Sequence, residues 1–157
     1  MSVSARTRPR RVLAAAASRL GRPAAPGIRA ARGPVPAGTP HHLRQLPSAV
    51  LGGGEVIHVA RTFRARLRGL LGTDVLPSGH ALLLTRTRSI HMLGMRLTID
   101  LVWLDAEGRP VRVDHAVAPG SHHRCRAARS VLETPSGEGD RFAALVRAGG
   151  VAMITGH

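Results

Sequence analysis

Residues 97–117 constrain the fold most strongly, because their apolar side chains alternate with the period of a β-hairpin. Positions 97, 99, 101 and 103 are all apolar, as expected for a strand with one buried face. A similar alternation resumes at 110–117, after a short turn that contains glycine. We therefore predict a strand over 97–105 and a return strand over 110–117.

The turn of this hairpin leaves two registers open. A three-residue turn whose glycine takes the left-handed conformation places Trp103 opposite Val111 and Asp100 opposite Asp114. Two facing carboxylates repel, so the pKa of one of them is expected to rise unless a cation or a metal lies between them. A shift of two residues would instead pair Asp100 with Arg112, and the sequence does not choose between the two.

The rest of the chain predicts short strands and two short helices. The predicted strands cover 56–60, 81–85, 128–134 and 151–155, and the predicted helices cover 63–71 and 141–148. Because strands and helices do not alternate regularly, we predict an α+β fold with a mainly antiparallel sheet or a small β-barrel. One domain is expected over residues 55–157.

Residues 1–54 differ from this domain in charge. They hold nine arginines and no acid, while residues 55–157 hold 14 arginines and nine acids, so +9 and +5 make the total of +14. Scattered proline and glycine with few large apolar side chains predict a disordered leader. Its arginines could bind nucleic acid or an anionic membrane nonspecifically. The alternative is a solvated segment without a partner.

Targeting and cofactor signals are few. The apolar run 12–17 is shorter than the roughly 7 to 15 residues of a signal-peptide core, so no export signal is recognised and a cytoplasmic location is expected. One cysteine, Cys125, cannot form an internal disulfide. We predict no cofactor, because the phosphate-cradling motifs of nucleotide-binding proteins are absent.

Four blocks are spread in order over residues 55–155. They are R-G-L-L-G at 68–72, H-M-L-G-M-R-L-T-I-D at 91–100, a strand, turn and strand at 101–111, and V-L-E followed by a glycine at 131–137. In these blocks the chain resembles the family catalogued as domain of unknown function 192, which consists of small prokaryotic proteins. The resemblance implies a compact β-rich domain and no particular reaction. It also implies an envelope setting, because many members carry signal peptides or membrane anchors.

The chain departs from this family at three positions. Leu71 stands where the family usually has Met, His91 where it has Trp, and Gly150 where it often has Asp. A role carried in the family by the Trp or by the late Asp therefore does not transfer to this chain.

Asp100 is the first candidate for chemistry, because a half-buried carboxylate between apolar neighbours needs partners. His91, in the loop predicted over 86–96, could pair with it for proton transfer or metal ligation. Asp114 would join this site in the first register. The alternative is structural, with Asp100 accepting hydrogen bonds from the loop or pairing with an arginine. His115 is expected on the apolar face of the hairpin.

Other side chains are candidates for binding. His122, His123 and Cys125 lie close together in a polar loop, but zinc sites usually draw ligands from two separated pairs, and the sequence supplies no second pair. Adventitious metal binding is therefore expected there rather than a dedicated site. Three further candidate ligand contacts are Arg68, Met92 and Arg112.

These patterns favour a noncatalytic binding or accessory domain, because no complete catalytic constellation is recognised. A protein partner at the cell envelope is the setting that the family resemblance implies. One alternative is a small hydrolase-like or metal-dependent enzyme that uses Asp100 with His91. The other is nonspecific binding of nucleic acid or anionic membrane through residues 1–54.

Overall fold

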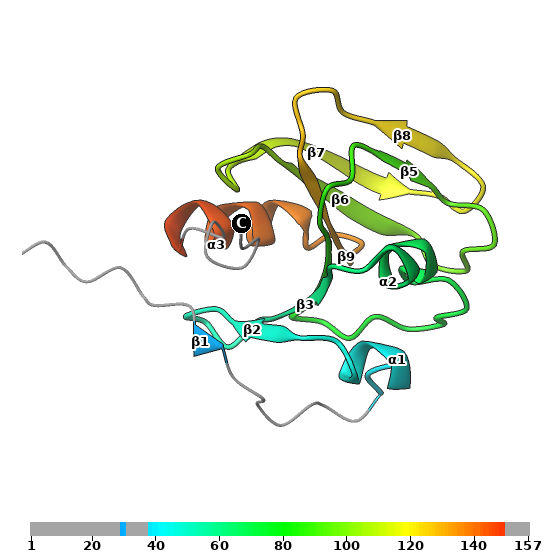
Figure 1. Ribbon diagram of the computed structural model, residues 1–157, viewed down its shortest axis with the longest axis horizontal. Coiled ribbons are helices and arrows are strands. Elements are labelled where there is room, and N and C mark those ends of the chain that lie inside the picture. The colour runs from blue at the N-terminus through cyan, green and yellow to red at the C-terminus, as the bar shows by residue number, and fades with distance from the viewer. Residues whose placement is uncertain (1–28, 31–37, 150–157) are drawn as a thin grey trace, which may run out of the picture.

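The computed structural model describes residues 29–30 and 38–149. This part of the chain forms nine strands and three helices, which are labelled in Figure 1. In chain order they are β1 (Arg29–Ala30), α1 (His41–Arg44), β2 (Ser48–Val50), β3 (Val56–Ala60), α2 (Phe63–Arg68), β4 (His80–Leu84), β5 (Ser89–His91), β6 (Ile99–Leu104), β7 (Pro110–Val117), β8 (His122–Arg124), β9 (Ser130–Pro135) and α3 (Gly139–Gly149). The final strand predicted over 151–155 lies outside the described residues.

Seven of the strands form one sheet in the order β1-β2-β3-β4-β9-β6-β7, and β5 pairs with β8 in a second, two-stranded sheet. The pair of β3 and β4 is parallel, with α2 in the connection, and the other neighbours are antiparallel. The predicted α+β class is confirmed. In the described part of the chain the large sheet is open, with β1 and β7 at its edges, so it does not close into a barrel.

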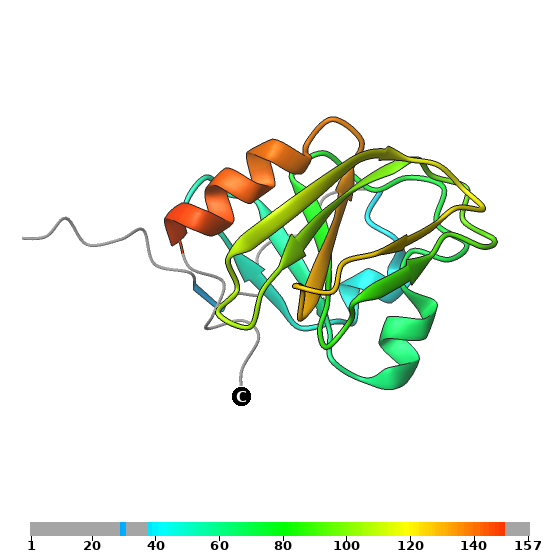
Figure 2. The ribbon, with the colours of Figure 1, turned by 90° about the horizontal axis from the view of Figure 1, so that it is seen from above.

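The large sheet is buried on both faces, and each face has its own core. On one face, α3 packs through Phe142 and Val146 against β6 and β9. On the other face, the β5–β8 sheet and the loops around α2 cover a core that contains Leu101 and Trp103. Figure 2 shows α3 on one side of the large sheet and the β5–β8 sheet on the other. All six residues of β6 are buried because the strand contributes side chains to both cores.

The domain begins upstream of the boundary expected at residue 55. β2 pairs antiparallel with β3, and α1 precedes it. The side chain of Leu43 in α1 is fully buried in the same core as Trp103, and Ala49 of β2 is 5% exposed. The charge contrast suggested a leader up to residue 54, but α1 and β2 before this residue are part of the fold. Residues 1–28 and 31–37 lie outside the described part of the chain.

Helix α2 is shorter than predicted, and this changes which side chains are buried. Thr62 caps it as expected, accepting a hydrogen bond from the N–H of Ala65 at 3.1 Å. The helix ends at Gly69, whose φ of 46° turns the chain, so Leu70 points into the core and is 1% exposed. The helix itself therefore keeps its apolar side chains near the surface, and none of its residues is buried.

Two strands lie within segments predicted to be loops. β5 falls within 86–96 and β8 within 119–126, and they pair with each other across a sequence separation of about 30 residues. Neither segment is long enough to show a convincing alternation of its own. The other predicted strands in the described region are found within two residues of their expected bounds.

The turn between β6 and β7 is the one predicted. Asp105 donates its backbone N–H to the carbonyl of Arg109 at 3.0 Å, and Gly108 takes a φ of 76°. The side chain of Asp105 supports the turn, because its Oδ1 accepts hydrogen bonds from the backbone N–H groups of Glu107 and Arg109 at 3.0 and 2.8 Å.

Both registers considered for the hairpin are wrong, because two irregularities in its ladder each shift the pairing by one residue, as β-bulges do. The first leaves Val111 as an extra residue, so Trp103 pairs with Arg112. Pro110 precedes it at the start of this edge strand, where a residue that cannot donate a ladder hydrogen bond is tolerated. The second lies around Ala116, whose φ is 48°.

As a result, Asp100 and Asp114 do not face each other. Leu101 lies opposite Asp114 in the observed register, and Asp114 binds the indole of Trp103 on one face of the sheet. Asp100 lies on the other face, beside α3. His115 is not on the apolar face as expected: its side chain is 53% exposed and contacts Asp100.

Replacing Leu43 with Ala tests whether the segment before residue 55 belongs to the core. We expect the free energy of unfolding to fall by about 3 kcal/mol, since a fully buried leucine leaves a cavity when it is truncated. Leu67→Ala is the matched control, because Leu67 is 72% exposed and its loss should change stability by less than about 0.5 kcal/mol. Urea denaturation of the full-length chain measures both. Equal, small effects would mean that α1 does not contribute to the domain.

Candidate functional site

Asp100 joins three parts of the fold on the α3 side of the sheet, where it is 1% exposed. Its Oδ2 accepts hydrogen bonds from the backbone N–H groups of Gly137 and Gly139 at 2.9 and 3.0 Å. Its Oδ1 accepts one from Ala116 N–H at 2.9 Å. A β-carbon at position 139 would lie 2.8 Å from the Cβ of Asp100, so only glycine fits without a shift. The carboxylate thus holds the start of α3 and the second bulge of β7 to β6.

The charge of Asp100 is stabilised by these donors. Burial raises its pKa, but hydrogen bonds from Ala116, Gly139, His115 and Gly137 outweigh burial and hold the pKa below its ordinary value. Nδ1 of His115 lies 3.4 Å from Oδ2. The carboxylate of Asp100 is thus held by structural hydrogen bonds, but its donors lie in β7 and in the turn before α3, and not in residues 86–96 or on an arginine as the structural alternative expected.

His91 lies on the other side of the sheet, in β5, and is not brought to Asp100. Its neighbour Ile90 belongs to the core that contains Trp103, whereas Asp100 lies beside α3. The ring of His91 stacks instead on that of His122, its cross-strand partner, with centroids 4.1 Å apart. The expected carboxylate–imidazole pair is thus not formed, and Asp114 does not join it.

Asp114 and Arg112 form a separate cluster with Trp103. Both carboxylate oxygens of Asp114 contact the guanidinium of Arg112 at 2.8 Å, and Oδ2 also accepts the indole N–H of Trp103 at 2.9 Å. Nδ1 of His123 lies 3.2 Å from the same oxygen. Burial raises the pKa of Asp114, but the Trp103, Arg112 and His123 contacts hold it below its ordinary value. Arg112 also donates to the carbonyl of Arg124, so the cluster fastens β8 to β7.

The three candidate metal ligands diverge. Along β8, His122 is exposed beside His91 while His123 points the opposite way to Asp114. Cys125 is buried in the core. Across residues 29–30 and 38–149, no three His, Cys, Asp or Glu side chains gather where they could hold a metal ion. Nor does any helix in these ranges have the length and apolarity to cross a membrane.

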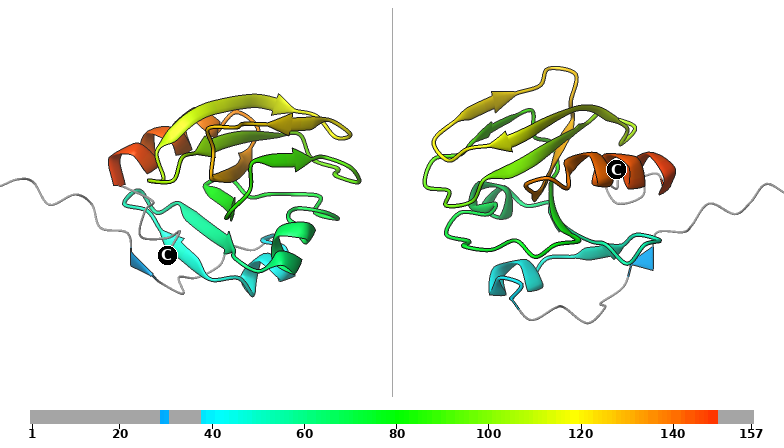
Figure 3. Two further views of the ribbon diagram at one scale, coloured as in Figure 1. Left: turned by 45° about the horizontal axis from the view of Figure 1, so that its top comes forward. Right: turned by 180° about the vertical axis from the view of Figure 1, so that it is seen from behind.

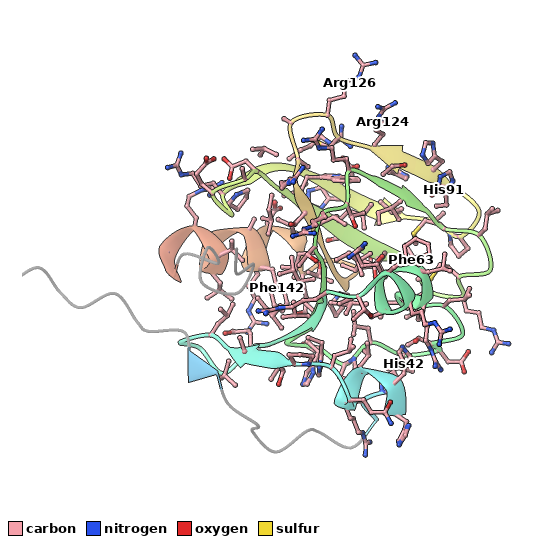
Figure 4. The ribbon with its side chains drawn as sticks, in the orientation of Figure 1. His42, Phe63, His91, Arg124, Arg126 and Phe142 are labelled. Atoms are coloured by element: carbon pink, nitrogen blue, oxygen red, sulfur yellow. The ribbon has the colours of Figure 1, made fainter. Side chains whose placement is uncertain are left out.

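A cleft of about 730 Å³ lies between α2 and β5, on the face of the sheet away from α3. Its walls come from α2, from the loop between β4 and β5, from β5 itself, and from β8. Figure 4 shows Phe63, His91 and Arg124 reaching the surface from three of these elements. Of the candidates from sequence, Arg68, Met92, His91 and His122 line the cleft, whereas Arg112 is not part of its lining.

Arginines dominate the charge of the cleft. Five of them line it, from α2, from the β4–β5 loop and from β8: Arg66, Arg68, Arg86, Arg88 and Arg124. Arg66 also donates to the carbonyl of Arg61 at 2.6 Å. Glu133 is the one acid in the described lining. Clustered guanidinium groups bind carboxylates and phosphates with charge-assisted, often bidentate hydrogen bonds, so the walls suit an anionic group.

Glu133 lies at the floor of the cleft, in the middle of β9. Its neighbours on the flanking strands are Leu82 and Leu101, and it is 3% exposed. Its Oε2 is buried without a hydrogen-bond partner among the described residues, 3.8 Å from where a β-carbon on Gly69 would lie. A buried polar atom without a partner destabilises the fold and therefore calls for a reason.

Burial raises the pKa of Glu133 from its ordinary 4.5 to about 8. At neutral pH most molecules therefore carry it as a neutral carboxylic acid, which can donate one hydrogen bond and accept others. Glu133 is not among the candidates predicted from the sequence, although it is the acid of the V-L-E block. Its position between Leu132 and Thr134 in a predicted strand could have marked it as a candidate, because Asp100 was chosen on the same kind of evidence.

The rim of the cleft is apolar. Phe63 and Leu67 are 71% and 72% exposed, and they lie one turn apart on the same side of α2. Leu93, in the loop after β5, is 69% exposed. Large apolar side chains gathered at the mouth of a cationic cleft are typical of a binding site.

One contact in the cleft resembles a nucleophile–base pair. Oγ of Ser89 lies 2.8 Å from Nε2 of His122. A catalytic pair of this kind needs a third group that orients the imidazole, most often a carboxylate. The ring packed on His122 is that of His91, which cannot serve as an acid of that type. We assign the contact to the packing of the β5–β8 sheet.

A second pair of buried titratable groups lies away from the cleft, on β3 and β4. Nε2 of His58 is 3.1 Å from Nδ1 of His80, and both residues are at most 3% exposed. Burial, and then the neighbouring His80, lower the pKa of His58 to about 4. This pair is therefore neutral near pH 7 and acts as a polar link inside the sheet.

Comparison with known proteins identifies a family and a fold. Residues 52–146 match DUF192, described as uncharacterized ACR. A "putative transcription regulator" from Sinorhizobium meliloti superposes with a TM-score of 0.51 at 20% identity, over 60% of this chain and 82% of that one. A protein of unknown function from Novosphingobium aromaticivorans gives 0.55 at 18% identity, over 77% and 91%. At such identities the likeness shows the fold alone. No curated protein matches the chain.

Replacing Asp100 with Ala should destabilise the fold by on the order of 3 kcal/mol, because three backbone N–H groups lose the buried carboxylate that accepts their hydrogen bonds. Asp74→Ala is the control, since the ion pair of Asp74 with Arg96 is exposed to solvent and its loss should change stability far less than the loss of Asp100. Urea denaturation at pH 7 measures both. Because the pKa of Asp100 is lowered in the fold, its contribution is present at neutral pH and is lost as acid protonates it. A mild effect of Asp100→Ala would contradict its structural role.

Replacing Glu133 with Gln should change how stability depends on pH. Between pH 4.5 and 8 the folded protein keeps a proton on Glu133 that the unfolded chain releases, so the wild type loses stability as the pH rises. The slope relative to Glu133→Gln is at most about 1.4 kcal/mol per pH unit. Urea denaturation at several pH values gives this difference, and subtracting the variant removes the opposite contribution of His58. The control Glu107→Gln retains Glu133 and should therefore retain the pH slope of the wild type. Parallel profiles for wild type and Glu133→Gln would disprove the raised pKa.

Proposed function

Since the chain belongs to the DUF192 family, we propose a function from its own cleft: the protein is a noncatalytic binding domain that receives an anionic ligand between α2 and β5. The family description names no reaction, so the proposal rests on the side chains present here. The volume of the cleft is in the range of sites that hold small molecules or short peptide segments.

The observation that carries the proposal is the convergence of five arginines from three separate elements on one cleft. Like charges repel, so their gathering destabilises the empty cleft unless an anion or solvent screens them. A ligand carboxylate or phosphate would relieve that repulsion and gain charge-assisted hydrogen bonds. The neutral Glu133 below adds a hydrogen-bonding group for an uncharged polar part of the ligand.

A noncatalytic role is favoured because the two side chains that the enzyme alternative requires, Asp100 and His91, lie apart. Asp100 holds backbone donors beside α3, and His91 stacks on His122 across the sheet. An envelope setting and a nucleic-acid or membrane role for the leader stay predictions. Most of the leader lies outside the described residues.

The proposal is tested by titrating isotopically labelled protein with inorganic phosphate and with hexa-aspartate while following backbone amide signals by NMR. We expect shifts at residues 66–69, 86–91 and 122–124. Arg68→Gln combined with Arg88→Gln should weaken binding by about tenfold or more, as expected when two charge-assisted contacts are lost.

The matched control is Arg109→Gln combined with Arg147→Gln. It removes the same net charge from the turn of the hairpin and from α3, both outside the cleft. Its affinity should stay within about twofold of the wild type, since distant exposed charges are screened by salt. Equal weakening in the two double variants, or shifts spread over the whole surface, would show that the anions respond only to net charge.

A further inference from the structure

We infer that the ligand is an extended, acidic segment of a partner protein, which adds as a third strand to the open edge of β5. This inference rests on the proposed function and specifies the ligand. It depends on three features of the cleft: an available strand edge, a charge that selects acids, and an apolar wall along the same edge.

The first feature is the edge of β5. Toward β8, the carbonyl of Arg88 accepts from the N–H of Cys125 at 3.0 Å, and Met92 exchanges hydrogen bonds with Ser121 and Gly120 at 2.8 and 2.9 Å. In an antiparallel pair, alternate residues face the partner strand. The residues between these positions, Ser89 and His91, therefore point their N–H and C=O groups away from β8.

That edge faces the cleft. Figures 1 to 3 place β5 between β8 and α2, and Ser89 and His91 are both part of the cleft lining. Outward-pointing main-chain groups at a sheet edge are a template for another strand, and short linear segments of partner proteins bind in this way. Two residues with both groups available offer up to about four main-chain hydrogen bonds.

The second feature is charge. Arg86 and Arg88 flank the edge in sequence, and Arg124 lies opposite Ser89 across the β5–β8 pair. A second copy of this chain would bring the same arginines to the edge and be repelled, which is how natural sheets protect their edges from self-pairing. An acidic segment is attracted instead. Charge complementarity therefore selects a partner over a second copy.

The third feature is the apolar wall. Side chains of an added strand would alternate between two faces. One face continues that of His91, His122 and Arg124, and the other continues that of Ile90. The exposed Phe63 and Leu67 of α2 line the same cleft. The segment that fits best alternates acidic and apolar residues.

The test uses the peptide acetyl-Asp-Leu-Asp-Leu-Asp-Leu-amide and the full-length protein. We expect binding that shifts the amide signals of Ser89 and His91 and slows their hydrogen exchange. A peptide with Lys in place of Asp keeps the apolar pattern and should bind at least about tenfold more weakly, as should the acidic peptide to the Arg68→Gln and Arg88→Gln double variant.

Backbone methylation of the peptide separates strand addition from simple charge attraction. Two versions carry N-methyl groups on all aspartates or on all leucines, with the same charge and composition. In an added strand one of these sets points its N–H groups at β5, so methylating that set alone should abolish binding. Loss on methylating the aspartates indicates antiparallel addition and loss on methylating the leucines parallel addition, and both support the inference.

Three outcomes would overturn the inference. If both methylated peptides bind as well as the unmodified one, the cleft holds anions without adding a strand, and the proposed function stands alone. If the lysine peptide binds equally well, charge does not select the partner. If neither phosphate, hexa-aspartate nor the acidic peptide binds, the proposed function fails as well.

Discussion

The buried carboxylate of Asp100 is the interaction on which the arrangement of the other elements depends. By accepting hydrogen bonds from Ala116, Gly137 and Gly139, it fixes both a bulge in β7 and the start of α3. The other shift in β7, at Val111, places Asp114 beside the indole of Trp103. Asp114 and Arg112 in turn fasten β8, which carries β5. The strand that supports the cleft on one face of the sheet is thus held by Asp100 on the other face.

Two buried acids of the same sheet show how surroundings decide the state of a carboxyl group. Asp100 and Glu133 are exposed by only 1% and 3%. Asp100 meets backbone donors and has a lowered pKa, whereas Glu133 lies among leucines and has a raised one. The first strengthens the fold and the second weakens it. We read the second as a group retained for binding, because Glu133 lines the cleft and its Oε2 has no partner among the described residues.

The sequence predicted most of the large sheet but not the cleft. Regular alternation located β6 and β7, the glycines before residue 56 marked the start of β3, and the turn at Gly108 was recognisable from its glycine. The register of the hairpin could not be predicted, because a bulge depends on tertiary partners such as Asp100 that lie far away in sequence. β5 and β8 are three residues each, so they depend on pairing with each other and on contacts with the rest of the fold. The candidate residues Arg68, Met92 and His91 do line the cleft, but Glu133 was overlooked.

The unpartnered Oε2 of Glu133 also links ligand binding in the cleft to the stability of the whole domain. A ligand that supplies a hydrogen-bond donor to this atom would satisfy a group that the empty protein leaves unsatisfied. Anything that binds only the folded state raises its resistance to unfolding, and here relief of a buried defect adds to that ordinary gain. The empty domain would then be the more perishable form, and a cell could clear it by proteolysis in preference to the complex.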